Sequence, residues 1–325
     1  MHATTRRTLL VATALALATP AVLAQDNYPS RPIMLINPYA VGGPADLIGR
    51  ALAKGLGDAL GQSVIVENKA GGGASIGAAD VAKAAPDGYT LLIGTAAAHT
   101  VTPLATKVPY DGVKDFEFVG MVANVPNILT VNPSVPAKTL KEFIALAKSQ
   151  PGKLSYVSAG LGSSPHIGGE MFKHAAKVDM IHIPYKGAAP AVTDMVAGTV
   201  PAGMLNISAV LPFIKSNRLR ALAYGGAKRS PDLPDVPTFA EAGLPDMENG
   251  SWYSLAVPVK TPPAIVDKLA KALQAVQKSP EFTKILAGQN AEAMPQMKTQ
   301  ATEFVRADGK RLAELVQATG MKLQD

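Results

Sequence analysis

The residues that decide the fold form one continuous stretch, Ile33-Met34-Leu35-Ile36-Asn37 followed by Pro38-Tyr39-Ala40-Val41-Gly42-Gly43-Pro44-Ala45-Asp46. The first part is mostly apolar, which is typical of a short strand buried on both faces. The part with glycine and proline indicates a tight turn, and residues 46–60 then show a helical pattern. A strand that passes through such a turn into a helix is the beginning of a parallel βαβ unit.

The alternation of strand and helix continues outward from this unit. Residues 119–131 are β-prone and are interrupted only by Pro126. The best-defined helix begins at Thr139, which forms a capping box with Glu142. Together the patterns predict an α/β protein with strands at 63–67, 89–94, 154–158, 180–184, 200–205 and 219–224 and helices at 76–84, 139–148, 165–176, 189–197 and 209–216.

The C-terminal third of the chain lacks a complete βαβ unit. It has a strand at 252–257, a helix with Thr261 as N-cap and Pro262 as first residue, and further helical segments up to Gly320. This part therefore completes a domain that began earlier in the chain.

We expect two lobes that are joined by two chain crossings. Residues 27–123 and 250–325 form the first lobe, and residues 124–249 form the second. Open α/β sheets bind ligands at the carboxyl ends of their strands, so the functional site is expected in the cleft between the lobes.

The composition excludes several classes of protein. The chain has 325 residues, of which 47% are hydrophobic and 17% charged, and it has no cysteine. This apolar content excludes collagen-like and disordered chains. The lack of cysteine excludes disulfide frameworks, thiolate metal sites and thiol nucleophiles.

The N-terminus has the pattern of a secretory signal. Arg6 and Arg7 precede an apolar run at 8–18, and small residues stand at Val22 and Ala24. We expect a signal peptide at 1–24 and a periplasmic mature protein, exported by the general secretory or the twin-arginine route. A membrane anchor needs about 20 apolar residues and fits less well. Loss of the two arginines lowers the formal charge from +6 to +4, which is too mild to indicate nucleic-acid binding.

The turn after the first strand could hold an anion. Gly42 and Gly43 let backbone amides approach a ligand, and the helix that follows adds the positive end of its dipole. The alternative is an ordinary tight turn, and the sequence leaves both open. Asp46 in the first turn of the helix complements the dipole. The small residues Thr95 and Ala96, after the third strand, leave room for a ligand.

A second glycine-rich loop opens a helix in the second lobe. Ser164 fits the N-cap position and Pro165 the first helical position. Capping alone does not require Gly160, Gly162 and Ser163 as well, so the loop favours an anion cradle with bare backbone amides.

Other polar residues follow strands of the second lobe. Tyr185 could line the cleft, Lys186 could pair with a carboxylate before Gly187, and Asn206 offers an amide that donates and accepts. His166 stands in the first turn of a helix, where a lone histidine is more typical of a structural role. It has no second histidine four residues later to form a metal pair.

One enzyme motif occurs. Residues 73–77 match G-x-S-x-G, the nucleophile elbow of α/β hydrolases, with Ser75 as the nucleophile. The elbow requires a strand that runs directly into the serine, whereas residues 68–72 intervene here, so the motif is a weak indication of an enzyme. A periplasmic serine esterase is kept only as the alternative from another class of protein. No dinucleotide fingerprint, P-loop or H-E-x-x-H motif occurs in the sequence.

At this point the motifs resemble those of the Bug family, the TctC-like extracytoplasmic solute receptors of tripartite tricarboxylate transport. The resemblance covers nearly all of the mature chain. It rests on residues 28–33, 39–46, 67–72 with 76–77, 86–92, 184–187, 218–223, 227–231, 233–238 and 241–245.

The resemblance implies a type II periplasmic binding protein fold, with two Rossmann-like lobes that close on a small mono-, di- or tricarboxylate. It implies no enzymatic activity, no cofactor and no metal, and we expect a monomer. The partner would be the membrane permease or, alternatively, a sensor kinase. Members often carry an acidic residue where Asn206 stands, so a plain organic acid is expected rather than an amino acid. The expected ligand-binding residues are Tyr39, Val41, Gly42, Gly43, Thr95, Ala96, Gly162, Ser163, Ser164, His166, Tyr185, Lys186, Gly187 and Asn206.

Overall fold

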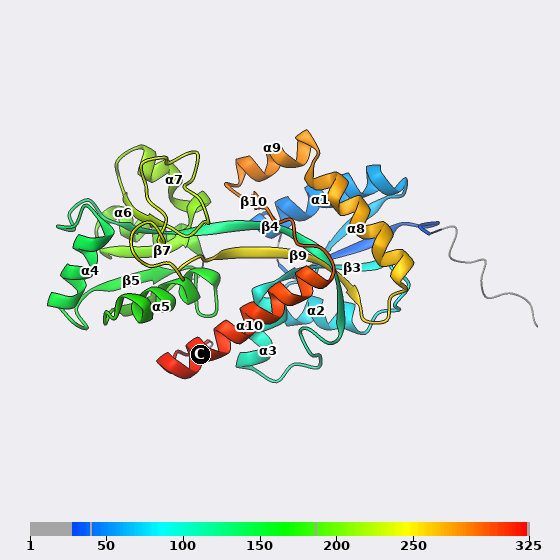
Figure 1. The fold of residues 1–325 in the computed structure, drawn as a ribbon, viewed down its shortest axis with the longest axis horizontal. Helices are drawn as coiled ribbons and strands as arrows, with labels where there is room; N and C mark the ends of the chain where they lie inside the picture. The colour runs from blue at the N-terminus through cyan, green and yellow to red at the C-terminus, as the bar shows by residue number, and fades with distance from the viewer. Residues whose placement is uncertain (1–27, 40, 186, 324–325) are drawn as a thin grey trace, which may run out of the picture.

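The computed structural model describes residues 28–39, 41–185 and 187–323. The expected signal peptide, residues 1–24, lies outside them. Two long strands, β4 (Phe116–Val131) and β9 (Gly250–Pro258), run through the middle of the molecule and connect its two halves (Figure 1). Among the helices of the described ranges, none has the length and apolar character needed to cross a membrane.

The first half contains the strands that flank the first glycine turn. Its strand order is β2 (Val64–Asn68), β1 (Ile33–Asn37), β3 (Thr90–Thr95), β9 and β4. β1 pairs in parallel with β2 and β3, as the alternation predicts, whereas β9 is antiparallel to β3 and β4. The short strand β10 (Glu292–Ala293) also pairs with β4. The carboxyl ends of β1 and β3 therefore lie at one edge of this half.

The second half repeats the arrangement on the other end of β4. The order is β6 (Ile181–Pro184), β5 (Ser155–Ser158), β7 (Ala202–Asn206) and β4. β5 is parallel to β6 and β7, and β7 is antiparallel to β4. The strand β8 (Arg220–Tyr224) also pairs with β4. The two-lobed α/β fold is thus confirmed.

Strand β4 continues through Pro126, where the sequence predicts an interruption. Pairing with β9 ends where Pro126 faces Gly250, and pairing with β7 begins where Asn127 faces Asn206. Proline has no N–H to give to a ladder. It is tolerated here because it stands where β4 exchanges one partner strand for the other.

Helices cover both faces of each half. In the first half, α1 (Pro44–Leu60), α8 (Pro263–Gln277) and α9 (Pro280–Gly288) share one hydrophobic core, and α2 (Ser75–Ala82) belongs to the core on the other face. In the second half, α4 (Leu140–Ser149) and α5 (Ser164–Ala176) cover one face, and α6 (Ala188–Ala197) and α7 (Ile207–Lys215) cover the other. Burial on both faces explains why the parallel strands read as continuous apolar runs.

The long helix α10 (Thr299–Thr319) contacts both halves. Near its start, Ala301 and Val305 pack into the core of the first half, whereas Leu315 near its end packs into the core of the second. The helix also contacts the π-helical turn η2 (Ala97–Val101), which precedes the short helix α3 (Thr102–Ala105). Figure 1 shows α10 running from beneath β9 toward α5.

Two predicted helix caps are wrong, and one is confirmed. Ser163, not Ser164, is the N-cap of α5: its backbone is extended and its Oγ accepts from the N–H of His166, while Ser164 is already helical. Pro262, not Thr261, caps α8, because the Thr261 hydroxyl donates to the Pro258 carbonyl instead. Thr139 caps α4 as predicted.

Candidate ligand-binding site

A cavity of about 380 Å³ lies between the two halves. Its walls come from the turns after β1 and β3, from the loop that opens α5, and from the start of β9. None of the described residues that line it carries a charge. Eight of the expected ligand-binding residues line it, namely Tyr39, Gly43, Thr95, Ala96, Gly162, Ser163, Ser164 and Asn206.

The other expected residues lie elsewhere. Val41 is 70% exposed, and Gly42 lies beside it in the same turn. His166 is buried beneath the loop, Tyr185 donates its hydroxyl to Asp194, and Gly187 is the N-cap of α6; none of these lines the cavity. Lys186 lies outside the described residues.

Several lining residues were not expected from the sequence. The expected return of the chain to the first lobe near residue 250 could have indicated the three lining residues of β9. Nothing in the sequence indicated Leu323. The missed residues are Pro44, Ala45, Gly73, Ala97, Val101, Thr102, Ala159, Leu161, Pro165, Ser251, Trp252, Tyr253 and Leu323.

Thr95 presents a hydroxyl on the first-half side of the cavity. Its Oγ1 lies 3.0 Å from the Tyr39 hydroxyl and accepts from the N–H of Ala98 over 3.3 Å. Burial raises the pKa of Tyr39, so its phenol stays protonated and can donate to Thr95. When Tyr39 is the donor in this pair, Thr95 keeps its own proton for another acceptor.

Ser164 presents the matching hydroxyl on the second-half side. Its Oγ accepts from the side-chain amide of Asn127 over 3.0 Å, and the same amide donates to Asn249 over 2.8 Å. Within the described chain the Ser164 hydroxyl has no acceptor of its own, so its proton is also available in the cavity.

The expectation of bare amides at three glycines is wrong. The N–H of Gly42 donates to Oδ2 of Asp46 over 3.0 Å, that of Gly160 to Oγ of Ser158 over 3.1 Å, and that of Gly162 to Nδ1 of His166 over 3.1 Å. Side chains at the helix starts and within the loops thus take N–H groups that precede the helix N-caps.

Asp46 fixes the first of these loops. It forms an ion pair with Arg50 at 3.0 Å and accepts from Asn68 over 3.0 Å. The hydrogen bond from Arg50 lowers the pKa of Asp46 to about 2, although burial acts in the opposite direction. The carboxylate therefore stays charged and holds the loop through these hydrogen bonds. Its place in the first turn of the helix is the one expected from the sequence.

Backbone donors remain at the helix starts, where among the described residues no acceptor is bound to the N–H of Gly43, the N-cap of α1. Ala45 in the first turn of α1 and Ser164 in the first turn of α5 line the cavity, and among the described residues no acceptor is bound to either N–H. Both lie at the positive end of a helix dipole.

Asn206 connects three strands at the cavity floor. Its side-chain amide donates to the Asn127 side chain over 2.7 Å, to the Val125 carbonyl over 3.1 Å and to the Ser251 hydroxyl over 3.1 Å. These contacts tie β7 to β4 and β9 and use its donors within the protein.

A pair of stacked histidines supports the second loop from below. The rings of His166 and His182 lie 4.1 Å apart at 15°, and both histidines are flanked by Tyr156. Burial lowers the pKa of each to about 4, and the nearby charge of Lys173 acts in the same direction. His166 is therefore neutral at pH 7, which lets its Nδ1 accept from Gly162.

Ser75 has none of the geometry of a nucleophile elbow. Strand β2 ends at Asn68, and the 3-10 turn η1 (Gly72–Ala74) separates it from Ser75, which begins α2. Within the part of the chain that the structure describes, no histidine is hydrogen-bonded to this serine, and no cluster of His, Asp or Glu could hold a metal.

Known proteins are similar to this chain in both sequence and fold. Residues 48–321 match the family described as tripartite tricarboxylate transporter family receptor. Protein BugT of Bordetella pertussis is 37% identical over 306 residues, which cover 94% of each chain.

Among solved structures, the R. palustris protein Rpa4515 with adipate is 34% identical with a TM-score of 0.78, covering 91% of this chain and 99% of its own. MatC from Rhodopseudomonas palustris with bound malate is 30% identical with a TM-score of 0.74, covering 89% of this chain and 100% of its own. The periplasmic binding protein BugD is 35% identical with a TM-score of 0.73, covering 91% of this chain and 99% of its own.

These matches span almost the whole described chain and agree with the two-lobed fold. They confirm the resemblance to the Bug receptors and the expectation that the protein is a receptor and no enzyme. The chain belongs to the tripartite tricarboxylate transporter receptor family of periplasmic solute-binding proteins.

Proposed function

We propose that this protein captures a small organic carboxylate in the cavity between its halves and delivers it to an inner-membrane tripartite permease. The family membership supports the role as a receptor. Two relatives whose structures hold adipate and malate support the class of ligand. Export by the signal peptide at 1–24 belongs to the same proposal.

The observation that carries the proposal is the pair of hydroxyls on opposite walls. Ser164 from α5 accepts from Asn127 and has a proton left to donate, and Thr95 from β3 accepts from Ala98 and has one left when Tyr39 is the donor to it. A carboxylate accepts but does not donate, and hydrogen bonds to a charged acceptor are shorter and stronger than neutral ones.

The helix starts add to this preference for an anion. The N–H groups of Ala45 and Ser164 lie at the N-termini of α1 and α5, where the dipoles favour negative charge. Since none of the described residues that line the cavity carries a carboxylate, a cationic amine would find no counter-charge among them. The apolar side chains of Val101, Leu161 and Trp252 suit the hydrocarbon part of an organic acid.

We infer that the lobes 27–123 with 250–325 and 124–249 close on the ligand by bending where β4 and β9 cross between them. Pro126 and Gly250 stand at this crossing. Hinge residues of this kind absorb backbone changes while the lobes move as units. Small-angle scattering should show a smaller radius of gyration when ligand is added, and an unchanged radius would contradict closure.

Isothermal titration calorimetry tests the proposal. Wild-type protein should bind at least one of malate, succinate, adipate and citrate, and should not bind putrescine or glucose. Thr95→Val and Ser164→Ala should each weaken binding about tenfold or more, because a hydrogen bond to a charged group contributes about 1.5–3 kcal/mol.

The matched controls are Thr193→Val on α6 and Ser149→Ala at the end of α4, two exposed hydroxyls outside the cavity. Both should bind as the wild type does. Equal affinities in all four variants would contradict the role of the two hydroxyls.

A further inference from the structure

The segment that follows α10 lies against the ligand cavity. The helix ends at Gly320, whose φ of 66° is left-handed and whose N–H donates to the Val316 carbonyl. The N–H of Met321 then donates to Oγ1 of Thr319. Two residues later, Leu323 is only 5% exposed and lines the cavity. A segment outside both βαβ sets thus supplies part of the wall.

Leu323 touches both halves at once. Its side chain packs with Val101 of the first half and Leu312 of α10. Its carbonyl oxygen would lie 2.7 Å from a Cβ added at Gly162, in the loop that opens α5. The segment therefore stands between the two loops that face each other across the cavity.

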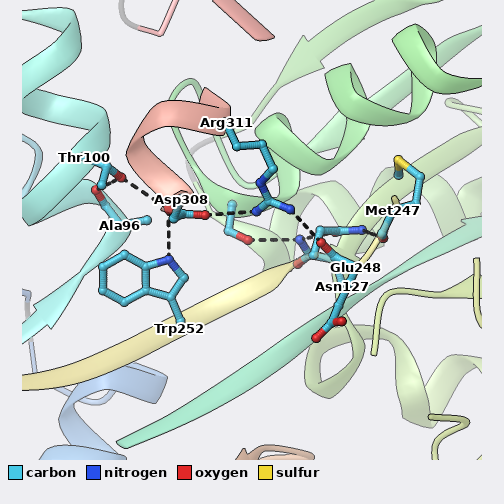
Figure 2. Close-up of polar contacts among 10 residues, drawn as sticks. Ala96, Thr100, Asn127, Met247, Glu248, Trp252, Asp308 and Arg311 are labelled. Carbon is cyan, nitrogen blue, oxygen red and sulfur yellow. Dashed lines mark hydrogen bonds and ion pairs between the residues drawn. The ribbon is translucent and has the colours of Figure 1, made fainter. Parts of the chain in front are cut away.

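Polar contacts fix the helix that carries this segment. Asp308 accepts from the indole N–H of Trp252 over 3.1 Å and forms an ion pair with Arg311 at 2.9 Å (Figure 2). Arg311 also donates to the carbonyl of Glu248 over 3.0 Å, beside the second chain crossing. Because α10 is held at the cavity wall and at the crossing, the position of Leu323 is defined by the fold.

We propose that Leu323 determines ligand specificity, by limiting the length of the acid that the cavity accepts. This inference rests on the proposed capture of a carboxylate. The segment offers apolar surface at this point, so it contacts the hydrocarbon part of the ligand and leaves the carboxylates to the hydroxyls and helix starts. A shorter side chain at this position lengthens the available space, and a bulkier one reduces it.

The test uses two substitutions with opposite effects. Leu323→Ala and Leu323→Phe are titrated by calorimetry with straight-chain diacids from succinate to suberate. Relative to wild type, Leu323→Ala should shift the ratio of affinities about tenfold toward the longer acids, and Leu323→Phe should shift it toward the shorter ones, as expected for methylene-sized changes in an apolar pocket. Lys322→Ala, an exposed neighbour in the same segment, should leave the ratio unchanged. A uniform loss of affinity with an unchanged ratio in both Leu323 variants would overturn the proposal.

A second readout does not depend on the ligand. Trp252 is 4% exposed and lines the same cavity, so acrylamide quenching of its fluorescence reports access to the wall. Leu323→Ala should increase quenching of the ligand-free protein, and Lys322→Ala should not. If the wild type binds no acid while quenching increases, the proposed function fails and Leu323 stands as a cavity wall. If quenching stays at the wild-type value, Leu323 is no barrier and the inference fails.

Discussion

The indole N–H of Trp252 donates a hydrogen bond to Oδ2 of Asp308 over 3.1 Å, although 56 residues separate the two along the chain. Trp252 begins the buried part of β9 and lines the cavity, while Asp308 lies on α10. The sequence has one tryptophan, so the fluorescence of the protein reports this contact and this wall. A ligand that enters the cavity should therefore change the emission of Trp252, and titration with a bound acid should give a saturable change.

Replacement of Asp308 should both destabilise the protein and weaken ligand binding. In Asp308→Ala the indole N–H and Arg311 lose their acceptor, and an unsatisfied buried donor costs about 1–3 kcal/mol of unfolding free energy. Asp308→Asn keeps an oxygen for the indole and should have a smaller effect. Urea unfolding followed by Trp252 emission measures both variants.

Asp58→Ala is the control for loss of a carboxylate from a helix. Asp58 pairs with Lys54 on the exposed side of α1, and such surface pairs contribute about 1 kcal/mol or less. If Asp308→Ala is no less stable than Asp58→Ala and binds ligand as the wild type does, the structural role of Asp308 is refuted.

Gly162→Ala should weaken ligand binding as well as lower stability, because the new methyl group disturbs the site in addition to straining the backbone. The φ of Gly162 is +68°, where an L-residue costs about 1 kcal/mol or more. The new Cβ would also lie 2.7 Å from the Leu323 carbonyl oxygen and 3.2 Å from Cγ1 of Val101. We expect lower stability together with weaker binding, measured by thermal unfolding and calorimetry.

Gly61→Ala separates the two causes. Gly61 ends α1 with a φ of +71°, and no atom lies within 4 Å of an added Cβ. This variant should lose a similar amount of stability through the backbone alone and should bind ligand with wild-type affinity. Wild-type affinity in Gly162→Ala as well would mean that this loop does not shape the site.

Stability should decrease as the pH falls below about 6.5. Burial lowers the pKa of His166 from 6.5 to about 4, so between these values the unfolded chain binds more protons than the folded one. The stabilisation is fully present above pH 6.5 and is lost as the pH falls to about 4, with a limit of about 3 kcal/mol for this group. Urea unfolding at a series of pH values measures the slope.

The stacked partner provides the matching variant. His182→Phe keeps an aromatic ring against His166 and removes one of the two titrations of the pair, while buried His99, whose pKa is also lowered to about 4, titrates in both proteins. The dependence of unfolding free energy on pH should become shallower in this variant. A slope equal to that of the wild type would show that the pair does not account for the acid sensitivity. Ligand affinity of the folded protein should fall only as the pH approaches about 4, because a protonated His166 no longer accepts from Gly162.

Local patterns were sufficient to predict most of the fold. The apolar run at β1 and the capping Thr139 of α4 appear in the structure where the sequence predicts them, because each depends on neighbouring residues. The continuity of β4 through Pro126 could not be predicted, since it depends on which strand lies beside each residue.

The site was predictable where it is built from loops and not where it is built from distant segments. Gly43, Thr95 and Ser164 follow strands, and the rule for open sheets places them at the cavity. Trp252 and Leu323 reach it only through the return of the chain and the path of α10. The prediction of bare amides was wrong for a different reason. Side chains close in sequence accept from those N–H groups, as His166 does from Gly162.

The most direct test of the central claim compares acids with uncharged amides of the same shape. Calorimetry on wild-type protein should detect binding of adipate or succinate at micromolar concentrations or lower, while adipamide and succinamide should not bind, because they lack the negative charge that the hydroxyls and helix starts favour. Binding of the amides as tightly as the acids, or of none of malate, succinate, adipate and citrate, would contradict capture of a carboxylate by this cavity.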